Sequence, residues 1–257
     1  MGQDVRVVRI EQTSLGETIV LDRPERRNAL TLPMWRALGS LVRSADERGR
    51  AEAATPGAGA PSEGEPLYVV GAGGYFCSGA DLGALRWARE SPEHADDFVS
   101  GVVECLLSLH TTGREVVAVV EGGAAGGGVE IMLACDRRVA IGAPSLVFPF
   151  GTHGMTLDDL TRWRLHQLVG ADEAERLVDG RHVVACEKAL ALGLLDGRYD
   201  TLEDLVAAEV ARRRRDAGGP GVTAEGEGYL RPGETPEQAV RRAAAPMRGA
   251  FPPHTGS

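Results

Sequence analysis

Two glycine-rich clusters constrain the fold of this chain most, because each follows an apolar run and precedes a helical pattern. The first reads GGYFCSGADLGAL (73–85) and the second reads VEGGAAGGGVEIMLACD (120–136). Glycine lets the backbone approach a ligand closely, and a helix start presents unpaired N–H groups at the positive end of the helix dipole. Two such starts that converge could stabilise a developing oxyanion. Each cluster alone is equally consistent with close packing of a helix on a strand.

The pattern around the clusters alternates between strands and helices. Apolar, β-rich runs predict strands at 5–10, 17–22, 66–73, 115–122 and 137–142. Helical spacing of apolar residues predicts helices in the stretch that follows residue 31 and at 92–110, 157–168, 171–178 and 187–197. This alternation indicates an α/β fold. The second cluster contains neither GxGxxG nor GK[ST], so it does not indicate a dinucleotide site or a P-loop.

Charge and cysteine content exclude several classes of partner. The formal net charge is −9 and the pI is about 5.2, which disfavours binding to nucleic acid or to an anionic membrane. The four cysteines are isolated, without a pattern typical of metal ligands, so no metal site is expected. The sequence shows neither a secretory pattern nor an apolar run of membrane-spanning length, and we expect a cytoplasmic protein.

Four segments resemble one known family. They are LDRPERRNAL (21–30), FCSGADL (76–82), AAGGGVEIMLACD (124–136) and LVGADEAERLVDGRHVVACEKALALGLLDGRYD (168–200). Together they resemble the enoyl-CoA hydratase/isomerase (crotonase) superfamily over roughly residues 5–200. The resemblance implies a spiral of ββα units, with an acyl-CoA-binding core at 1–200. Residues 201–257 are expected to form a divergent, shortened C-terminal helical segment that ends in a flexible tail.

The resemblance also implies a set of site residues. The thioester carbonyl of an acyl-CoA would lie between the backbone N–H groups of Ser78 and Gly127, and Glu130 would transfer a proton. Arg26 would meet the phosphates of CoA. Further contacts with the substrate are implied at Ala29, Ala80, Gly126 and Phe150. No cofactor is expected apart from the coenzyme A of the substrate, and the family's homotrimer or dimer of trimers is the expected assembly.

One acid of the family pattern is missing from this chain. Hydratases of the family use two glutamates, and a count back from LVG (168–170) places Phe150 at the second position. Glu130 could act alone in an apolar pocket that raises its pKa. Alternatively, His153, Asp158 or Asp159 could replace the lost acid, or the fold could have lost catalysis.

These observations predict an acyl-CoA enzyme, or an enzyme of carrier-bound acyl thioesters, that stabilises a thioester enolate. Hydration or dehydration in a specialised pathway is the first hypothesis. Double-bond isomerisation, or other enolate chemistry that uses Glu130 alone, is the second. The third is a non-catalytic, crotonase-like partner subunit, which the replacement at Phe150 and the short C-terminus favour.

Overall fold

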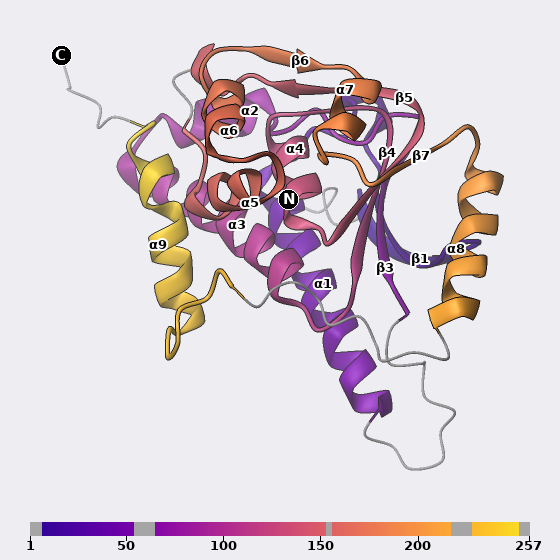
Figure 1. The fold of residues 1–257 in the computed structure, drawn as a ribbon. Helices are drawn as coiled ribbons and strands as arrows, with labels where there is room; N and C mark the ends of the chain where they lie inside the picture. The colour runs from indigo at the N-terminus through magenta and orange to yellow at the C-terminus, as the bar shows by residue number, and fades with distance from the viewer. Residues whose placement is uncertain (1–6, 54–64, 153–155, 217–227, 252–257) are drawn as a thin grey trace.

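The computed structural model describes residues 7–53, 65–152, 156–216 and 228–251, which form an α/β fold (Figure 1). The strands are β1 (Val8–Thr13), β2 (Gly16–Leu21), β3 (Leu67–Gly71), β4 (Val116–Ala125), β5 (Arg137–Phe148), β6 (His182–Val184) and β7 (Gly197–Tyr199). The helices are α1 (Leu32–Ala53), α2 (Leu82–Ala88), α3 (Pro92–Thr111), α4 (Gly127–Ala134), α5 (Asp159–Val169), α6 (Ala171–Val178), α7 (Cys186–Ala191), α8 (Leu202–Asp216) and α9 (Pro236–Arg248). No helix in these ranges is long and apolar enough to cross a membrane.

The sheet orders its strands β1-β2-β3-β4-β5-β6, and β7 pairs with β5. Strands β2 to β5 are parallel neighbours, whereas β1 and β6 pair antiparallel with β2 and β5. Parallel strands place their carboxyl ends at one edge of a sheet, so the loops that follow β3 and β4 lie side by side. The first glycine cluster contains the loop after β3, and the second covers the end of β4 and the helix α4 that follows it directly.

Side chains of the central strands alternate between two apolar layers, as the pleat of a sheet requires. Val69 and Ala118 belong to the main core, whereas Tyr68 and Val117 face a smaller cluster on the other side. Helix α8 covers this smaller cluster, where the Tyr68 hydroxyl donates to Glu209 at 2.8 Å. Figure 1 shows α8 on one side of the sheet and the helices α1, α3 and α9 on the other.

The predicted strands and most of the predicted helices are present, with boundaries that differ by several residues. Three short elements lacked a sequence signal, namely α2, β6 and β7. The segment 201–257, which the sequence predicts to be helical, contains α8 and α9, and α9 is a helix of 13 residues with Pro246 inside it. A capping box joins Thr235 and Gln238, and Pro236 occupies the first turn, where its missing N–H costs nothing. The remaining tail, 252–257, and the linker at 217–227 lie outside the described residues.

Asn28 ties the segment before α1 to the loop that follows β3. Its backbone is left-handed, with a φ of 56°, a conformation that asparagine tolerates better than most residues. The side chain accepts from the N–H of Arg23 at 2.8 Å and donates to the carbonyls of Ala72, Tyr75 and Phe76 at 3.0, 2.6 and 3.2 Å. Because Asn28 is fully buried, water cannot replace these hydrogen bonds.

Replacing Asn28 by alanine should therefore destabilise the fold markedly. Asn28→Ala leaves buried carbonyls without a donor and replaces asparagine by a residue that tolerates the left-handed backbone less well, so we expect a loss of about 2–4 kcal/mol in the free energy of unfolding. Urea denaturation measures this loss. The exposed neighbour Glu25 provides the control, since Glu25→Ala should change the stability by no more than about 0.5 kcal/mol. Equal stability of the two variants would contradict a bracing role for Asn28.

Candidate active site

The two glycine clusters touch each other at two positions where no side chain fits. Gly79 has a φ of +94°, and a β-carbon on it would lie 2.7 Å from the carbonyl oxygen of Ala125 and 2.9 Å from the nitrogen of Gly127. A β-carbon on Gly128 would lie 2.2 Å from the carbonyl oxygen of Cys77. The N–H of Ala125 donates to that same carbonyl at 2.9 Å. The predicted convergence of the clusters is therefore present in the structure.

Two backbone N–H groups lie close together at this junction. Gly127 is the first residue of α4, and the first N–H groups of a helix have no partner within it. The nitrogen of Ala80 lies 3.4 Å from the point where a β-carbon of Gly127 would stand, so the two residues are in close proximity. Neither N–H donates a hydrogen bond to any group in the described part of the chain. Both are therefore available to an oxyanion.

Ser78 does not supply such a donor in this structure, which argues against its predicted role. Its N–H donates to the carbonyl of Arg27 at 2.9 Å, and its hydroxyl donates to the carbonyl of Arg26 at 3.1 Å. The N–H is thus used to hold the loop against the segment before α1. The N–H of Ala80, two residues later, has no such partner among the described residues, and Gly79 between them has a φ of +94°, so the segment is not a regular extended strand.

A cavity of about 250 Å³ opens beside these N–H groups. It contains six of the predicted site residues, which are Ser78, Ala80, Gly126, Gly127, Glu130 and Phe150. The other lining residues carry no predicted role, and they are Trp35, Gly79, Leu82, Leu85, Arg89, Phe98, Val102, Pro149, Thr156 and Met247. Most of these are apolar and come from α1, α2, α3 and α9. The cavity therefore suits an apolar group attached to a polar head.

Glu130 lies in α4, one turn after Gly127, and its side chain faces this cavity. The residue is 5% exposed, and burial raises the pKa of Glu130 to about 8 because it disfavours the charged form. The charge of Asp158 acts in the same direction. Glu130 is the only acidic residue that lines the cavity among the residues that the structure describes. A carboxyl group with a pKa near neutrality suits proton transfer.

Phe150 stands in the wall of the same cavity, where the family pattern has its second glutamate. It is 5% exposed and packs edge-on against Phe148, with a distance of 6.4 Å between the ring centroids. The ring cannot exchange a proton, and it removes polar surface from the cavity. This apolar wall adds to the burial that favours the protonated form of Glu130.

Asp158 lies behind Glu130 and caps helix α5. One carboxylate oxygen accepts from the N–H of Thr161 at 2.9 Å, whereas the other, Oδ2, is buried without a hydrogen-bond partner among the described residues. Burial raises the pKa of Asp158 to about 6, although the N–H groups at the start of α5 oppose this increase. Burial and the repulsion between the two carboxylates therefore favour a pair that carries a single negative charge.

The remaining predicted residues lie elsewhere. Asp159 points away from the cavity, because its carboxylate pairs with Arg242 at 3.1 Å and accepts from the hydroxyl of Tyr229 at 3.1 Å. Asp159 also does not line the cavity, which argues against the hypothesis that it replaces the lost acid. His153 lies outside the described residues. Neither the exposed Arg26 nor Ala29 lines the cavity, so their contacts with CoA stay predictions.

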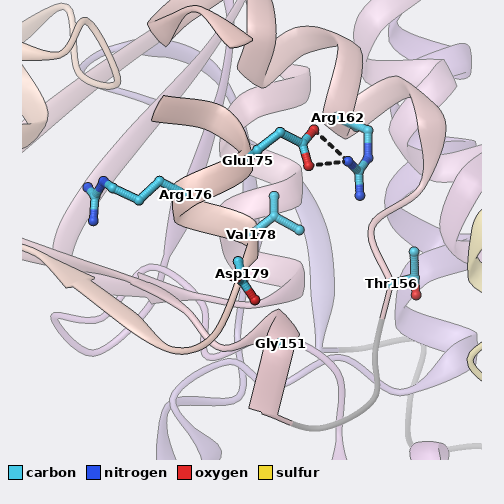
Figure 2. Close-up of a pocket in the computed structure, with 7 residues that line it drawn as sticks. All are labelled: Gly151, Thr156, Arg162, Glu175, Arg176, Val178 and Asp179. Atoms are coloured by element: carbon cyan, nitrogen blue, oxygen red, sulfur yellow. Dashed lines mark hydrogen bonds and ion pairs between the residues drawn. The ribbon is translucent and has the colours of Figure 1, made fainter. Parts of the chain in front are cut away.

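A second, larger cavity of about 520 Å³ lies away from the glycine clusters (Figure 2). It is lined by Gly151, Thr156, Arg162, Glu175, Arg176, Val178 and Asp179. Figure 2 shows Arg162 bound to both carboxylate oxygens of Glu175, at 2.5 and 2.6 Å. This cavity is open to solvent, and its central charges already pair with each other. The smaller cavity, which holds Glu130 and the unpaired N–H groups, is therefore the candidate active site.

Known proteins resemble this chain in sequence. The family model for enoyl-CoA hydratase/isomerase matches residues 67–218, which is more than half of the chain. A probable enoyl-CoA hydratase of Mycobacterium tuberculosis is 31% identical over 208 residues, covering 80% of this chain and 76% of the relative. The ethylmalonyl-CoA decarboxylase of Xenopus laevis is 30% identical over 197 residues, covering 74% of this chain and 59% of that protein.

Solved structures of the same family share the fold. The enoyl-CoA hydratase from Bacillus halodurans has a TM-score of 0.75 at 22% identity and covers 95% of both chains. An enoyl-CoA hydratase from Polaromonas has a TM-score of 0.68 at 25% identity and covers 82% of this chain and 77% of that one. The α/β architecture is thus that of crotonase-fold hydratases. The chain belongs to the enoyl-CoA hydratase/isomerase (crotonase) superfamily.

Proposed function

We propose that this protein binds an acyl-CoA thioester and transfers a proton at its α-carbon through a stabilised enolate. Membership of the superfamily supports an acyl-CoA substrate. The observation that carries the proposal is the position of Glu130, the only acidic residue of the described cavity wall, one helical turn from the N–H of Gly127. This arrangement puts a proton carrier beside the groups that would stabilise the enolate.

The N–H groups of Ala80 and Gly127 would bind the thioester oxygen. As the α-carbon loses or gains a proton, negative charge develops on that oxygen, and fixed donors stabilise it without reorganisation. The N-terminus of α4 adds the positive end of its dipole. Ala80, and not Ser78, would thus supply one of the two N–H donors. The predicted chemistry stays the same.

Proton transfer by Glu130 alone fits the cavity better than hydration. Hydration needs a positioned water as well as an acid and a base, and Phe150 occupies the place of the family's second glutamate. Some relatives are named ethylmalonyl-CoA decarboxylase, and loss of CO₂ from such a thioester leaves an enolate that needs one proton and no added water. Isomerisation or another enolate reaction therefore becomes the first candidate.

Hydration stays as the second candidate function because the family model and several relatives carry the name enoyl-CoA hydratase. In a hydration, Glu130 would act either as the acid or as the base. Asp158 would have to reach the substrate to act as the other. Contacts of Arg26 with the phosphates of CoA, and assembly into a homotrimer or a dimer of trimers, complete the proposal.

Replacing Glu130 by glutamine should abolish proton transfer. We expect the wild type to exchange α-hydrogens of a suitable acyl-CoA in D₂O, and Glu130→Gln to lower the rate by about 100- to 10,000-fold. Mass spectrometry of a panel of saturated, unsaturated and carboxylated thioesters measures the exchange and also detects added water or lost CO₂. The exposed Glu121 on β4 provides the control, because Glu121→Gln should keep the wild-type rate.

Each result of this experiment selects one hypothesis. Exchange without a gain in mass from water supports the enolate chemistry proposed here. Efficient addition of water to an unsaturated thioester would favour the hydratase instead. The third outcome is that the wild type and Glu130→Gln bind acyl-CoA equally well and neither changes the mass of any thioester. This outcome would identify a non-catalytic binding subunit.

The pH dependence of exchange should reveal the influence of Asp158 on Glu130. Exchange begins with the carboxylate form of Glu130, so the wild-type rate should rise as the pH increases through about 8 and then level off. Asp158→Asn keeps an oxygen that can accept from Thr161 but removes the neighbouring negative charge. Glu130 then loses its proton at lower pH, and exchange at pH 7 should become faster.

The same titration distinguishes two roles for Asp158. In the first case, the exchange rate of Asp158→Asn rises at lower pH than that of the wild type and reaches the same plateau. This result supports Asp158 as a positioning residue that acts through the charge on Glu130. An unchanged pH profile would contradict any influence of Asp158. Loss of exchange at every pH in a folded Asp158→Asn protein would mean that Asp158 itself transfers a proton.

A further inference from the structure

One cation lines the otherwise apolar cavity, and no step of the proposed proton transfer uses it. Arg89 follows directly after helix α2, and it lines the cavity together with Leu82 and Leu85. These three residues are spaced by three and four positions, so they lie on one face of the helical segment. Arg89 therefore lies on the same side of α2 as Leu82 and Leu85, which is the side that faces the cavity.

Arg89 has no acidic partner within residues 7–53, 65–152, 156–216 and 228–251. Its backbone N–H closes the last turn of α2, but its guanidinium takes part in no ion pair or hydrogen bond there. By contrast, Arg23 pairs with Asp81 at 2.8 Å at the opposite end of the same helix. Arg89 is exposed at the rim of the cavity, so its guanidinium is open to an anion that enters there.

The cavity itself provides no negative charge that would neutralise Arg89. Its single acidic residue, Glu130, is buried and favours the neutral form at neutral pH. A carboxylate in the cavity would thus meet attraction from Arg89 and no fixed repulsion from Glu130. The guanidinium matches a carboxylate by two parallel hydrogen bonds, which gives this group geometric selectivity as well as charge.

We propose that Arg89 selects acyl groups that end in a carboxylate, so that the substrates are carboxyacyl-CoA thioesters. The proposal rests on the function proposed above and specifies its substrate class. Helix α2 has seven residues and rises about 1.5 Å per residue, so Arg89 lies on the order of 10 Å along the helix from Ala80. The carboxylate would therefore stand at the end of the acyl chain that lies away from the thioester.

The phosphates of CoA are a second source of negative charge. These phosphates are strongly hydrated, whereas the cavity that Arg89 lines is mostly apolar, with Leu85, Phe98 and Met247 among its wall residues, so the acyl end of the substrate is the better match. The two sources predict different behaviour. A contact with phosphate would strengthen binding of every CoA thioester, whereas a contact with the acyl carboxylate would strengthen only the carboxylated ones.

Binding of glutaryl-CoA and pentanoyl-CoA tests the proposal, because these acyl groups have the same chain length and differ in a terminal carboxylate or methyl group. We expect isothermal titration to give about tenfold tighter binding of glutaryl-CoA to the wild type. Arg89→Gln should abolish this preference and leave pentanoyl-CoA binding unchanged. Arg86→Gln, at an exposed position on α2 outside the cavity wall, is the matched control and should keep the preference.

The titrations are repeated in the Glu130→Gln background, where proton transfer is absent. A preference for glutaryl-CoA that persists there supports the role of Arg89 even if the proposed reaction proves wrong. Equal or tighter binding of pentanoyl-CoA to the wild type would overturn the proposal. An equal loss of affinity for both thioesters in Arg89→Gln would also overturn it, by assigning Arg89 to the CoA moiety.

Discussion

The contact between the two glycine loops is the constraint on which the site depends. Gly79 and Gly128 bring the backbone after β3 against the backbone at the start of α4, at distances that exclude any β-carbon. That approach positions the N–H groups of Ala80 and Gly127 together, and Asn28 holds the first loop from behind. The parallel strands deliver both loops to one edge of the sheet, so the geometry of the site follows from the order of the strands.

Burial of two carboxyl groups determines how the site can react. Glu130 and Asp158 come from α4 and α5, and the low polarity around them leaves one proton on the pair at neutral pH. Phe150 reinforces this state by keeping polar groups away from Glu130. Arg89 adds the only positive charge in the described wall.

The sequence predicted the elements whose signals are local. Apolar periodicity located most helices and strands, and the resemblance of the second glycine cluster to the family pattern pointed to Gly127 and Glu130. Whether Ser78 or Ala80 has a free N–H depends on which of them donates to the carbonyl of Arg27. That hydrogen bond joins distant segments of the sequence. Likewise, Asp158 and Asp159 are neighbours in sequence, but only the fold turns one into the core and the other towards Arg242. Arg89 and Met247 carried no signal because tertiary packing alone makes them part of the cavity.

Helix α9 returns to the core and places Met247 in the cavity wall, while Arg242 and Arg248 fasten it to Asp159 and Asp96. Figure 1 shows this helix lying alongside α3, far along the chain from the glycine loops. One part of the cavity wall is therefore encoded more than 100 residues after the glycine loops. A substitution at Met247 would change the shape of the cavity without altering the sequence of those loops.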